Sequence, residues 1–171
     1  KQQRPVSGAN DMFDVPITKI LLTIAALGSG IIGGIFFAFS TFIMTSLSEI
    51  PNESGISAMN AINRVIVRSW FMPVFVGMVV VSVVLVVVAV RNWDVGTGGL
   101  IITGALVYIV ACFISTIVFS VPLNDRLATF DGRGAAAAEF WVVYLRDWTF
   151  WNHVRTLASL AASGLFIWAI G

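Results

Sequence analysis

The chain has 171 residues, of which 58% are hydrophobic and only 11% are charged. Soluble domains carry about 25% charged residues, so this composition excludes an ordinary soluble domain and indicates an all-α integral membrane protein. Ten basic and nine acidic residues nearly cancel, which leaves no charge excess for binding nucleic acid. The single cysteine, Cys112, and the single histidine, His153, exclude an intrachain disulfide and a metal centre built from several Cys or His residues of this chain alone.

Residues 1–16 are polar and contain proline and glycine, which predicts a loose N-terminal arm before the membrane. Residues 17–171 are expected to form a single transmembrane domain. The first uncharged run, residues 20–47, is long enough to cross the hydrocarbon core with some tilt.

The first run contains a glycine-rich stretch in which Gly30 and Gly34 lie four positions apart. Small residues at this spacing let another helix backbone approach closely. We expect the face between Gly28 and Gly34 to pack inside the bundle. The alternative is that this face contacts a second copy of the chain or another subunit of a larger membrane complex.

Residues 48–55 are expected to form a loop, and residues 56–69 an amphipathic helix. The polar side chains of this helix recur at helical spacing, and its apolar side chains lie largely opposite. The polar stripe consists of Ser57, Asn60, Arg64 and Arg68. This pattern predicts a helix that lies along the membrane interface or caps the bundle. The next apolar run, residues 69–90, predicts the second transmembrane helix.

Residues 91–99 are expected to form a short turn, and residues 100–122 a third transmembrane helix. Residues 122–126 are expected to leave the membrane, and residues 135–148 to form a second interfacial helix. The last transmembrane helix begins near Phe150. The chain is therefore predicted to be a four-transmembrane-helix bundle with two interfacial amphipathic helices on one side.

The two interfacial segments resemble each other in sequence. Each follows a glycine and ends on an Arg-x-Trp triplet, which occupies residues 68–70 in the first segment and residues 146–148 in the second. With two transmembrane helices in each unit, this likeness predicts an internal two-span repeat about an axis along the membrane normal. The alternative is that arginine and tryptophan simply favour membrane interfaces.

A dense group of candidate functional residues lies near the start of the last transmembrane helix. Trp148, Trp151, Asn152 and Arg155 are spaced i, i+3, i+4 and i+7, so they share one face of a helix. The helix beyond Arg155 is roughly 24 Å long, which is less than the roughly 30 Å hydrocarbon core. We therefore expect Arg155 and His153 at the entrance of the membrane or about one turn inside it, where ionisable groups usually face protein or a wet cavity.

Further polar residues are expected on the same side of the membrane. They are Asn60, Asn63, Arg64, Asn124, Asp125 and Arg126. We interpret these residues as part of a pocket for an apolar ligand, with His153 at its floor and the interfacial helices as its roof. In this hypothesis Asp125 pairs with Arg155. The alternative is a capping network, in which Asp125 pairs with an arginine and the asparagine side chains bind loop backbone.

His153 is the candidate general base, because an ordinary histidine titrates near neutral pH. Trp148 and Trp151 offer flat faces for an aromatic substrate. The alternative role for His153 is that of an interfacial hydrogen-bonding residue. The sequence contains no phosphate-binding loop, dinucleotide fingerprint or hydrolase elbow.

Four elements of the chain are together similar to one known family. They are the glycine-rich first transmembrane helix that runs into Phe-Phe-Ala-Phe-Ser-Thr-Phe, the helix with Asn60 and Asn63, the stretch Val-Pro-Leu-Asn-Asp-Arg-Leu at residues 121–127, and the Trp-Asn-His-Val-Arg-Thr core at residues 151–156. These elements resemble the anthrone oxygenase-like family of small four-span membrane proteins. The resemblance covers essentially the whole chain after Pro16.

The resemblance implies a cofactor-independent oxidoreductase, because fungal members are associated with oxidising a polycyclic anthrone to an anthraquinone without a metal or flavin. In that activity His153 would be the base, and Arg155 or Asn152 would stabilise the developing oxyanion. The ligand-binding residues would be Trp148, Trp151, Asn124, Asp125, Asn63 and Arg64. The rival function is that of a non-catalytic accessory subunit that packs through its glycine face. In either case we expect an integral protein of the bacterial plasma membrane, surrounded by membrane lipids.

Overall fold

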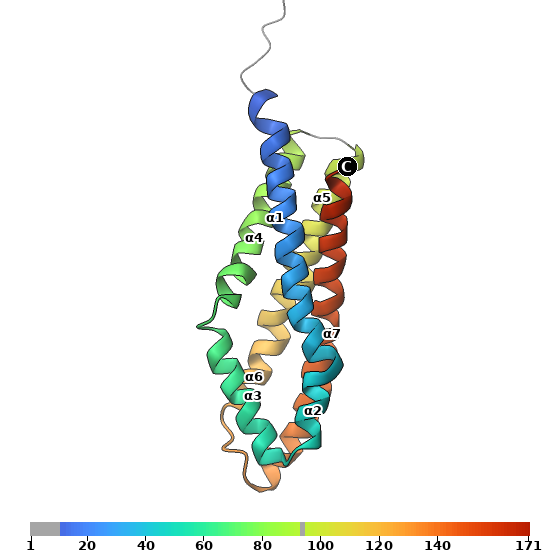
Figure 1. The fold of residues 1–171 in the computed structure, drawn as a ribbon. Coiled ribbons are helices and arrows are strands. Elements are labelled where there is room, and N and C mark those ends of the chain that lie inside the picture. Colours follow the sequence, from blue (N-terminus) through green and yellow to red (C-terminus); the bar gives the residue numbers. More distant parts are fainter. Residues whose placement is uncertain (1–10, 93–94) are drawn as a thin grey trace, which may run out of the picture.

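The long apolar runs of the sequence form helices, because a backbone inside a bilayer must satisfy its hydrogen bonds within its own segment. The structure is a computed structural model that describes residues 11–92 and 95–171 (Figure 1). Its helices are α1 (Asp11–Ala38), α2 (Met44–Glu49), α3 (Asn52–Ile66), α4 (Phe71–Arg91), α5 (Val95–Leu106), α6 (Val121–Leu127) and α7 (Gly134–Ala169). Three π-helical stretches join some of them, namely η1 (Phe39–Ile43), η2 (Val107–Ile114) and η3 (Thr116–Ser120).

The helices stack end to end into four long columns that run side by side (Figure 1). The first column consists of α1, η1 and α2, and the second of α3 and α4. The third consists of α5, η2, η3 and α6, and α7 forms the fourth alone. With 36 residues, α7 is about 54 Å long, compared with about 30 Å for a hydrocarbon core. A helix of this length is longer than a hydrocarbon core is thick.

Among the described residues, three helical stretches are long and apolar enough to cross a membrane. They are Ile17–Glu49, Phe71–Arg91 and Gly96–Leu127. The expectation of an all-helical membrane protein is therefore confirmed, with three candidate transmembrane stretches among the described residues. The C-terminal column, α7, does not qualify by composition, because Asn152, His153 and Arg155 interrupt its apolar run.

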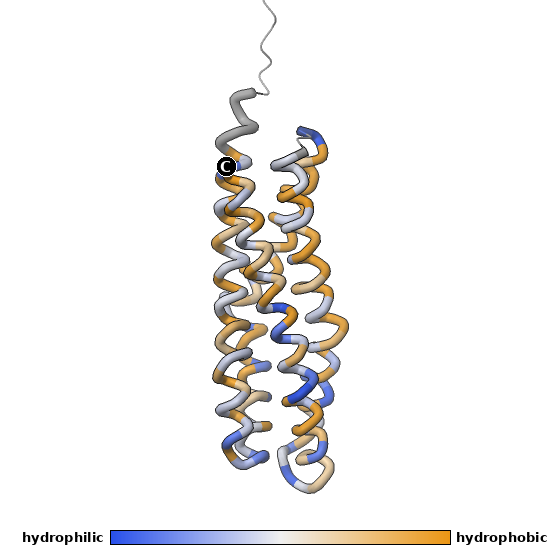
Figure 2. The backbone as a smooth tube through the Cα atoms, turned by 90° about the vertical axis from the view of Figure 1, so that its right-hand side faces the viewer, coloured by the Kyte–Doolittle hydropathy of each residue, from blue (hydrophilic) through white to orange (hydrophobic). Residues whose placement is uncertain are grey.

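Polar residues are more frequent at the end of the bundle formed by α2, α3, α6 and the first half of α7, which we call the polar end (Figure 2). Two clusters of buried apolar residues fill the bundle. The cluster at the polar end includes Met44, Met59, Leu127, Trp141, Tyr144 and Trp148. The cluster in the rest of the bundle includes Leu22, Ile32, Phe36, Phe75, Tyr108 and Phe166.

Several helix boundaries differ from those predicted. The loop expected at residues 48–55 is reduced to Ile50 and Pro51, because α2 continues to Glu49 and α3 begins at Asn52. The segment expected to leave the membrane at residues 122–126 is helical instead. Its proline occupies the first turn of α6, where a missing backbone N–H costs nothing.

The N-terminal segment and the turn between α4 and α5 also differ from expectation. Helix α1 begins at Asp11, so the last part of the expected N-terminal arm is helical, whereas residues 1–10 lie outside the described residues. Helix α5 begins at Val95, so the turn expected at residues 91–99 is shorter, and residues 93–94 of that turn are likewise not described.

The second interfacial helix, expected at residues 135–148, is not a separate element but the first part of α7. The sequence contains neither proline nor glycine between Gly134 and Gly164, so nothing ends the helix at the membrane boundary. The first interfacial helix does end, at Ile66, before a turn that contains Trp70. Trp70 is 85% exposed at this turn, whereas Trp148 is buried within a continuous helix. The two segments therefore do not repeat each other in structure.

The glycine-rich stretch of α1 packs mainly inside the bundle. A Cβ atom on Gly33 would lie 2.9 Å from Leu160 Cδ2, and one on Gly30 would lie 3.4 Å from Ser163 Oγ, both on α7. The expectation that Gly30 faces another helix is confirmed. For Gly34 it is wrong within this chain, because Gly34 is exposed and no described atom lies within 4 Å of the position of its Cβ.

These two neighbouring positions make a matched pair for a stability test. We expect Gly33→Leu to lower the free energy of unfolding by about 1–3 kcal/mol, because the new side chain must displace Leu160 from α1. Gly34→Leu is expected to unfold at the wild-type temperature in detergent, measured by circular dichroism. An equal loss of stability in Gly34→Leu would contradict this and place that face against another protein chain.

Candidate functional site

Asn152 and Arg155 form a buried polar layer between the two hydrophobic clusters. Asn152 is fully buried, and Arg155 is 3% exposed. The Asn152 Nδ2 atom donates hydrogen bonds to the Phe36 carbonyl oxygen at 2.7 Å and to Ser40 Oγ at 2.8 Å. Thr156 Oγ1 in turn donates to the Asn152 carbonyl oxygen at 2.8 Å. This network joins the middle of α7 to the point where the first column changes from α-helix to π-helix, a type of irregularity that is frequent at functional sites.

The guanidinium group of Arg155 lies between two aromatic rings. Its Cζ atom is 4.7 Å from the centroid of the Phe36 ring and 4.8 Å from that of the Trp148 ring, within the range of cation–π attraction. Its Nη2 atom donates to Asn152 Oδ1 at 3.2 Å. Its Nε atom is buried and has no hydrogen-bond partner among the described residues. Most of the hydrogen-bonding capacity of this cation is therefore unused by the described part of the chain.

The acidic partner expected for Arg155 is not formed, so the predicted pair with Asp125 is wrong. Within the described ranges, the ion pairs are Arg133–Glu53 at 3.0 Å and Arg146–Asp147 at 2.6 Å. Asp125 is exposed, whereas its neighbour Asn124 is half-buried. The physical reason is that residues 121–127 form a helix rather than a turn, so successive side chains point in different directions, and of these two neighbours only Asn124 faces the interior.

A cavity of about 310 Å³ lies beside the polar layer, with walls from all four columns. Its aromatic lining residues are Phe36, Phe39, Phe71, Phe75, Phe113 and Trp148. Its polar lining residues are Asn63, Thr116, Asn124 and Arg155. An apolar cavity with a few convergent polar groups is the usual form of a small-molecule site.

Tyr144 holds two of the polar lining residues in place. Its hydroxyl donates to Asn124 Oδ1 at 2.7 Å and accepts a hydrogen bond of 3.4 Å from Asn63 Nδ2. The Tyr144 ring is buried and stacks between Trp141 and Trp148, at centroid distances of 5.5 and 6.0 Å. Because these rings fix the hydroxyl group, the side-chain amides from α3 and α6 keep defined positions at the cavity.

The structure brings together part of the predicted site. The residues found at the cavity or in the polar layer behind it are Asn63, Asn124, Trp148, Asn152 and Arg155. His153, Asp125 and Arg64 are exposed and do not line the cavity. His153 is therefore not in position to act as a base for a ligand bound there.

Trp151 lies on the edge of the face that it was predicted to share with Arg155. Its ring stacks on Phe119, with a centroid distance of 3.6 Å and an interplanar angle of 3°. It lines a separate groove, together with Asp147 and Arg126. Trp151 is thus an aromatic contact between α7 and the third column and does not offer its ring to the cavity.

Two residues of the site were missed by sequence reasoning. Tyr144 lies four positions before Trp148 and eight before Asn152, so its place on the same helix face was available as a signal. Ser40 carried no such signal. Its hydrogen bond to Asn152 joins residues 112 positions apart, and only the packing of α7 against the first column brings them together.

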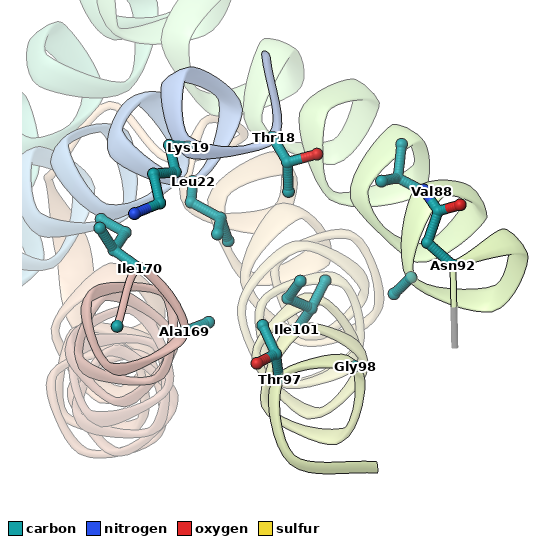
Figure 3. Close-up of a pocket in the computed structure, with 12 residues that line it drawn as sticks. Thr18, Lys19, Leu22, Val88, Asn92, Thr97, Gly98, Ile101, Ala169 and Ile170 are labelled. Carbon is teal, nitrogen blue, oxygen red and sulfur yellow. The ribbon is translucent and has the colours of Figure 1, made fainter. Parts of the chain in front are cut away.

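A second cavity, of about 350 Å³, lies at the end of the bundle opposite the polar end. Figure 3 shows the side chains that line it. It is lined by the ends of helices, including Thr18 and Lys19 of α1, Asn92 after α4, and Ile170 after α7. This cavity lies away from the polar layer, so we place the candidate site in the first cavity. In the described part of the chain, no group of three or more His, Cys, Asp or Glu side chains is arranged to hold a metal ion.

Comparison with known proteins adds one finding. Residues 67–165, more than half of the chain, match the family model described as anthrone oxygenase. The matched segment contains α4, the third column and most of α7, and with them Trp148 and Arg155. Neither the curated proteins nor the solved structures include a match to the chain.

Proposed function

Because this chain belongs to the anthrone oxygenase family, we propose that it binds an apolar aromatic or lipid-like small molecule in the cavity beside Arg155 and oxidises it with molecular oxygen. The observation that carries this proposal is Arg155 itself. It is a buried cation that lines an apolar cavity, and no carboxylate in the described ranges pairs with it.

The energetics of Arg155 favour a partner that is not part of the protein. Removing an ion from water costs several kcal/mol even after the protein relaxes, and one neutral hydrogen bond offsets only part of this cost. The two ring contacts contribute about 0.5–2 kcal/mol each. An anionic oxygen of a ligand would supply the missing charge and accept from the unused N–H groups.

The chemistry of an anthrone suits this arrangement. Its CH₂ group between two aromatic rings loses a proton to give an enolate, whose oxygen carries the negative charge. A guanidinium group beside that oxygen stabilises the enolate, and the proton passes to water. Molecular oxygen then adds at the carbon, and loss of water leaves a carbonyl group, so that CH₂ and O₂ become C=O and H₂O. In this scheme Arg155 acts electrostatically, and no general base from the lining residues is required.

We include in this proposal that α7 is a fourth transmembrane helix. Its C-terminal half lies along α1 (Figure 1) and buries the small residues Ala158, Ser159 and Ala162. Beyond the exposed His153, its outward side chains are apolar, and Leu157 and Trp168 are 69% and 74% exposed. Such a face suits lipid. As a transmembrane helix, α7 would place Arg155 inside the boundary of a bacterial plasma membrane, where a buried charge usually marks a functional site.

The proposal is tested by turnover of a hydroxylated anthrone with the protein reconstituted in liposomes. We expect one molecule of oxygen to be consumed for each anthraquinone formed, above the rate in protein-free liposomes. Arg155→Met should remove this activity, whereas His153→Ala should retain it, because His153 lies outside the cavity. Loss of activity in His153→Ala alone would overturn the electrostatic scheme. If the protein neither binds nor oxidises the anthrone, the non-catalytic accessory subunit is the remaining function.

A further inference from the structure

The cavity has a mouth that is entirely apolar. Four of its lining residues are also exposed on the outside of the bundle and therefore mark the opening. They are Val67, Val76, Ile117 and Val121, with exposed fractions of 58, 43, 52 and 39%. The polar lining residues are all less exposed than this, so none of them reaches the rim.

The position of these residues shows which way the mouth faces. Val67 lies in the turn between α3 and α4, and Val76 follows in α4, whereas Ile117 and Val121 lie on the third column. The opening is therefore between the second and third columns. Three of the four residues belong to stretches that are apolar and long enough to cross a membrane. Exposed valine and isoleucine side chains on such stretches face lipid rather than water.

The depth of the mouth follows from its neighbour Trp70. This side chain is 85% exposed in the turn beside Val67. Tryptophan favours the headgroup level of a bilayer. The mouth therefore lies at the membrane surface, with Val67 on the polar-end side of Trp70 and Val76 on its bilayer side, within reach of amphiphilic molecules that dissolve in the bilayer with their polar end at the interface.

The charged lining residue of the cavity is much less exposed than the mouth residues. Arg155 is 3% exposed and stands against Trp148 of α7 and Phe36 of the first column, whereas the mouth residues belong to the second and third columns. A ligand with one charged end would place that end on the guanidinium group and its apolar part toward the lipid. The reverse orientation would place the apolar part against Arg155 and leave this buried charge without an anionic partner, which is costly.

We propose that the ligand enters sideways from the bilayer through the mouth formed by Val67, Val76, Ile117 and Val121. The ligand is an amphiphile with a single anionic oxygen, such as a phenolate, an enolate or a carboxylate, on an aromatic or lipid-like body. This inference rests on the cavity of the proposed function, but it does not require that the ligand be oxidised.

The first test uses anthracene carboxylate as a fluorescent probe with the full chain in liposomes. Val76→Trp is expected to fill the mouth and to reduce probe binding at least tenfold. Val80→Trp is the matched control, because Val80 lies one turn further along α4, is 59% exposed, and does not line the cavity. It should bind the probe as the wild type does. If Val76→Trp binds the probe as tightly as the wild type does, the proposed entrance is wrong.

A second test does not depend on ligand binding. Val76→Cys lies within the apolar stretch of α4, so it should react with an uncharged maleimide that dissolves in lipid, and should resist a charged, membrane-impermeant thiol reagent. The wild type gives the background, since its Cys112 is buried. Rapid reaction with the charged reagent would show that the mouth opens to water. That result would contradict entry from the bilayer, whether or not the probe binds. If the wild type binds no probe in either detergent or liposomes, the binding function fails, and the labelling pattern then reports on the opening alone.

Discussion

Replacing Arg155 with methionine is expected to abolish the preference of the cavity for anionic ligands without destabilising the fold. Charge-assisted hydrogen bonds contribute about 1.5–3 kcal/mol, so affinity for anthracene carboxylate should fall roughly tenfold to hundredfold. The melting temperature should stay the same or rise. Methionine fills a similar volume without a charge, and replacing buried ions by apolar side chains is often neutral or stabilising.

The uncharged analogue anthracene methanol separates a charge effect from a change of shape. It should bind wild type and Arg155→Met with similar affinity. Arg91→Met is the control for net charge, because Arg91 is exposed in the last turn of α4, away from the cavity. It should leave both affinities unchanged. A large drop in melting temperature for Arg155→Met would show instead that the guanidinium group is needed for folding, and would count against a ligand-binding role.

Gly55 is expected to be the least replaceable glycine at the polar end. A Cβ atom there would lie 2.8 Å from the Leu47 carbonyl oxygen and 2.9 Å from Trp141 Cζ2. The carbonyl group belongs to α2 and cannot rotate away as a side chain can. The Trp141 ring is fully packed in the cluster at the polar end. We expect Gly55→Ala to lower the free energy of unfolding by about 1–3 kcal/mol, and Gly55→Leu to prevent stable folding of this end.

A glycine on the neighbouring helix gives the matched control. Gly77 in α4 has no described atom within 4 Å of the position of its Cβ. Gly77→Ala should therefore be neutral or should stabilise by up to about 1 kcal/mol, as expected for a helix interior. Both variants are compared by circular dichroism melting in detergent. Gly55→Ala should also weaken probe binding, because α3 carries Asn63 to the cavity. Wild-type melting of Gly55→Ala would contradict the tight packing of α2 against α3.

The sequence by itself determined the class of the protein and most of its helices. The length of each apolar run predicted the helices now found at Phe71–Arg91 and Gly96–Leu127, because in lipid the backbone has no alternative to helix. It also placed Asn152 and Arg155 on one helix face, since that relation depends only on 3.6 residues per turn. These properties follow from neighbours along the chain, and no knowledge of the packing was needed.

Only the tertiary structure decided which way each face points. Spacing put Trp151 and Arg155 together, but the rotation of α7 sends Trp151 to Phe119 and Arg155 to Phe36. The same holds for Asn124 and Asp125, which are adjacent in sequence but face opposite environments. Contacts between columns, such as Asn152 with Ser40, are set by how four helices fill a shared interior. The packing of the interior depends on all the side chains together, so the residue pattern along a single helix cannot predict these contacts.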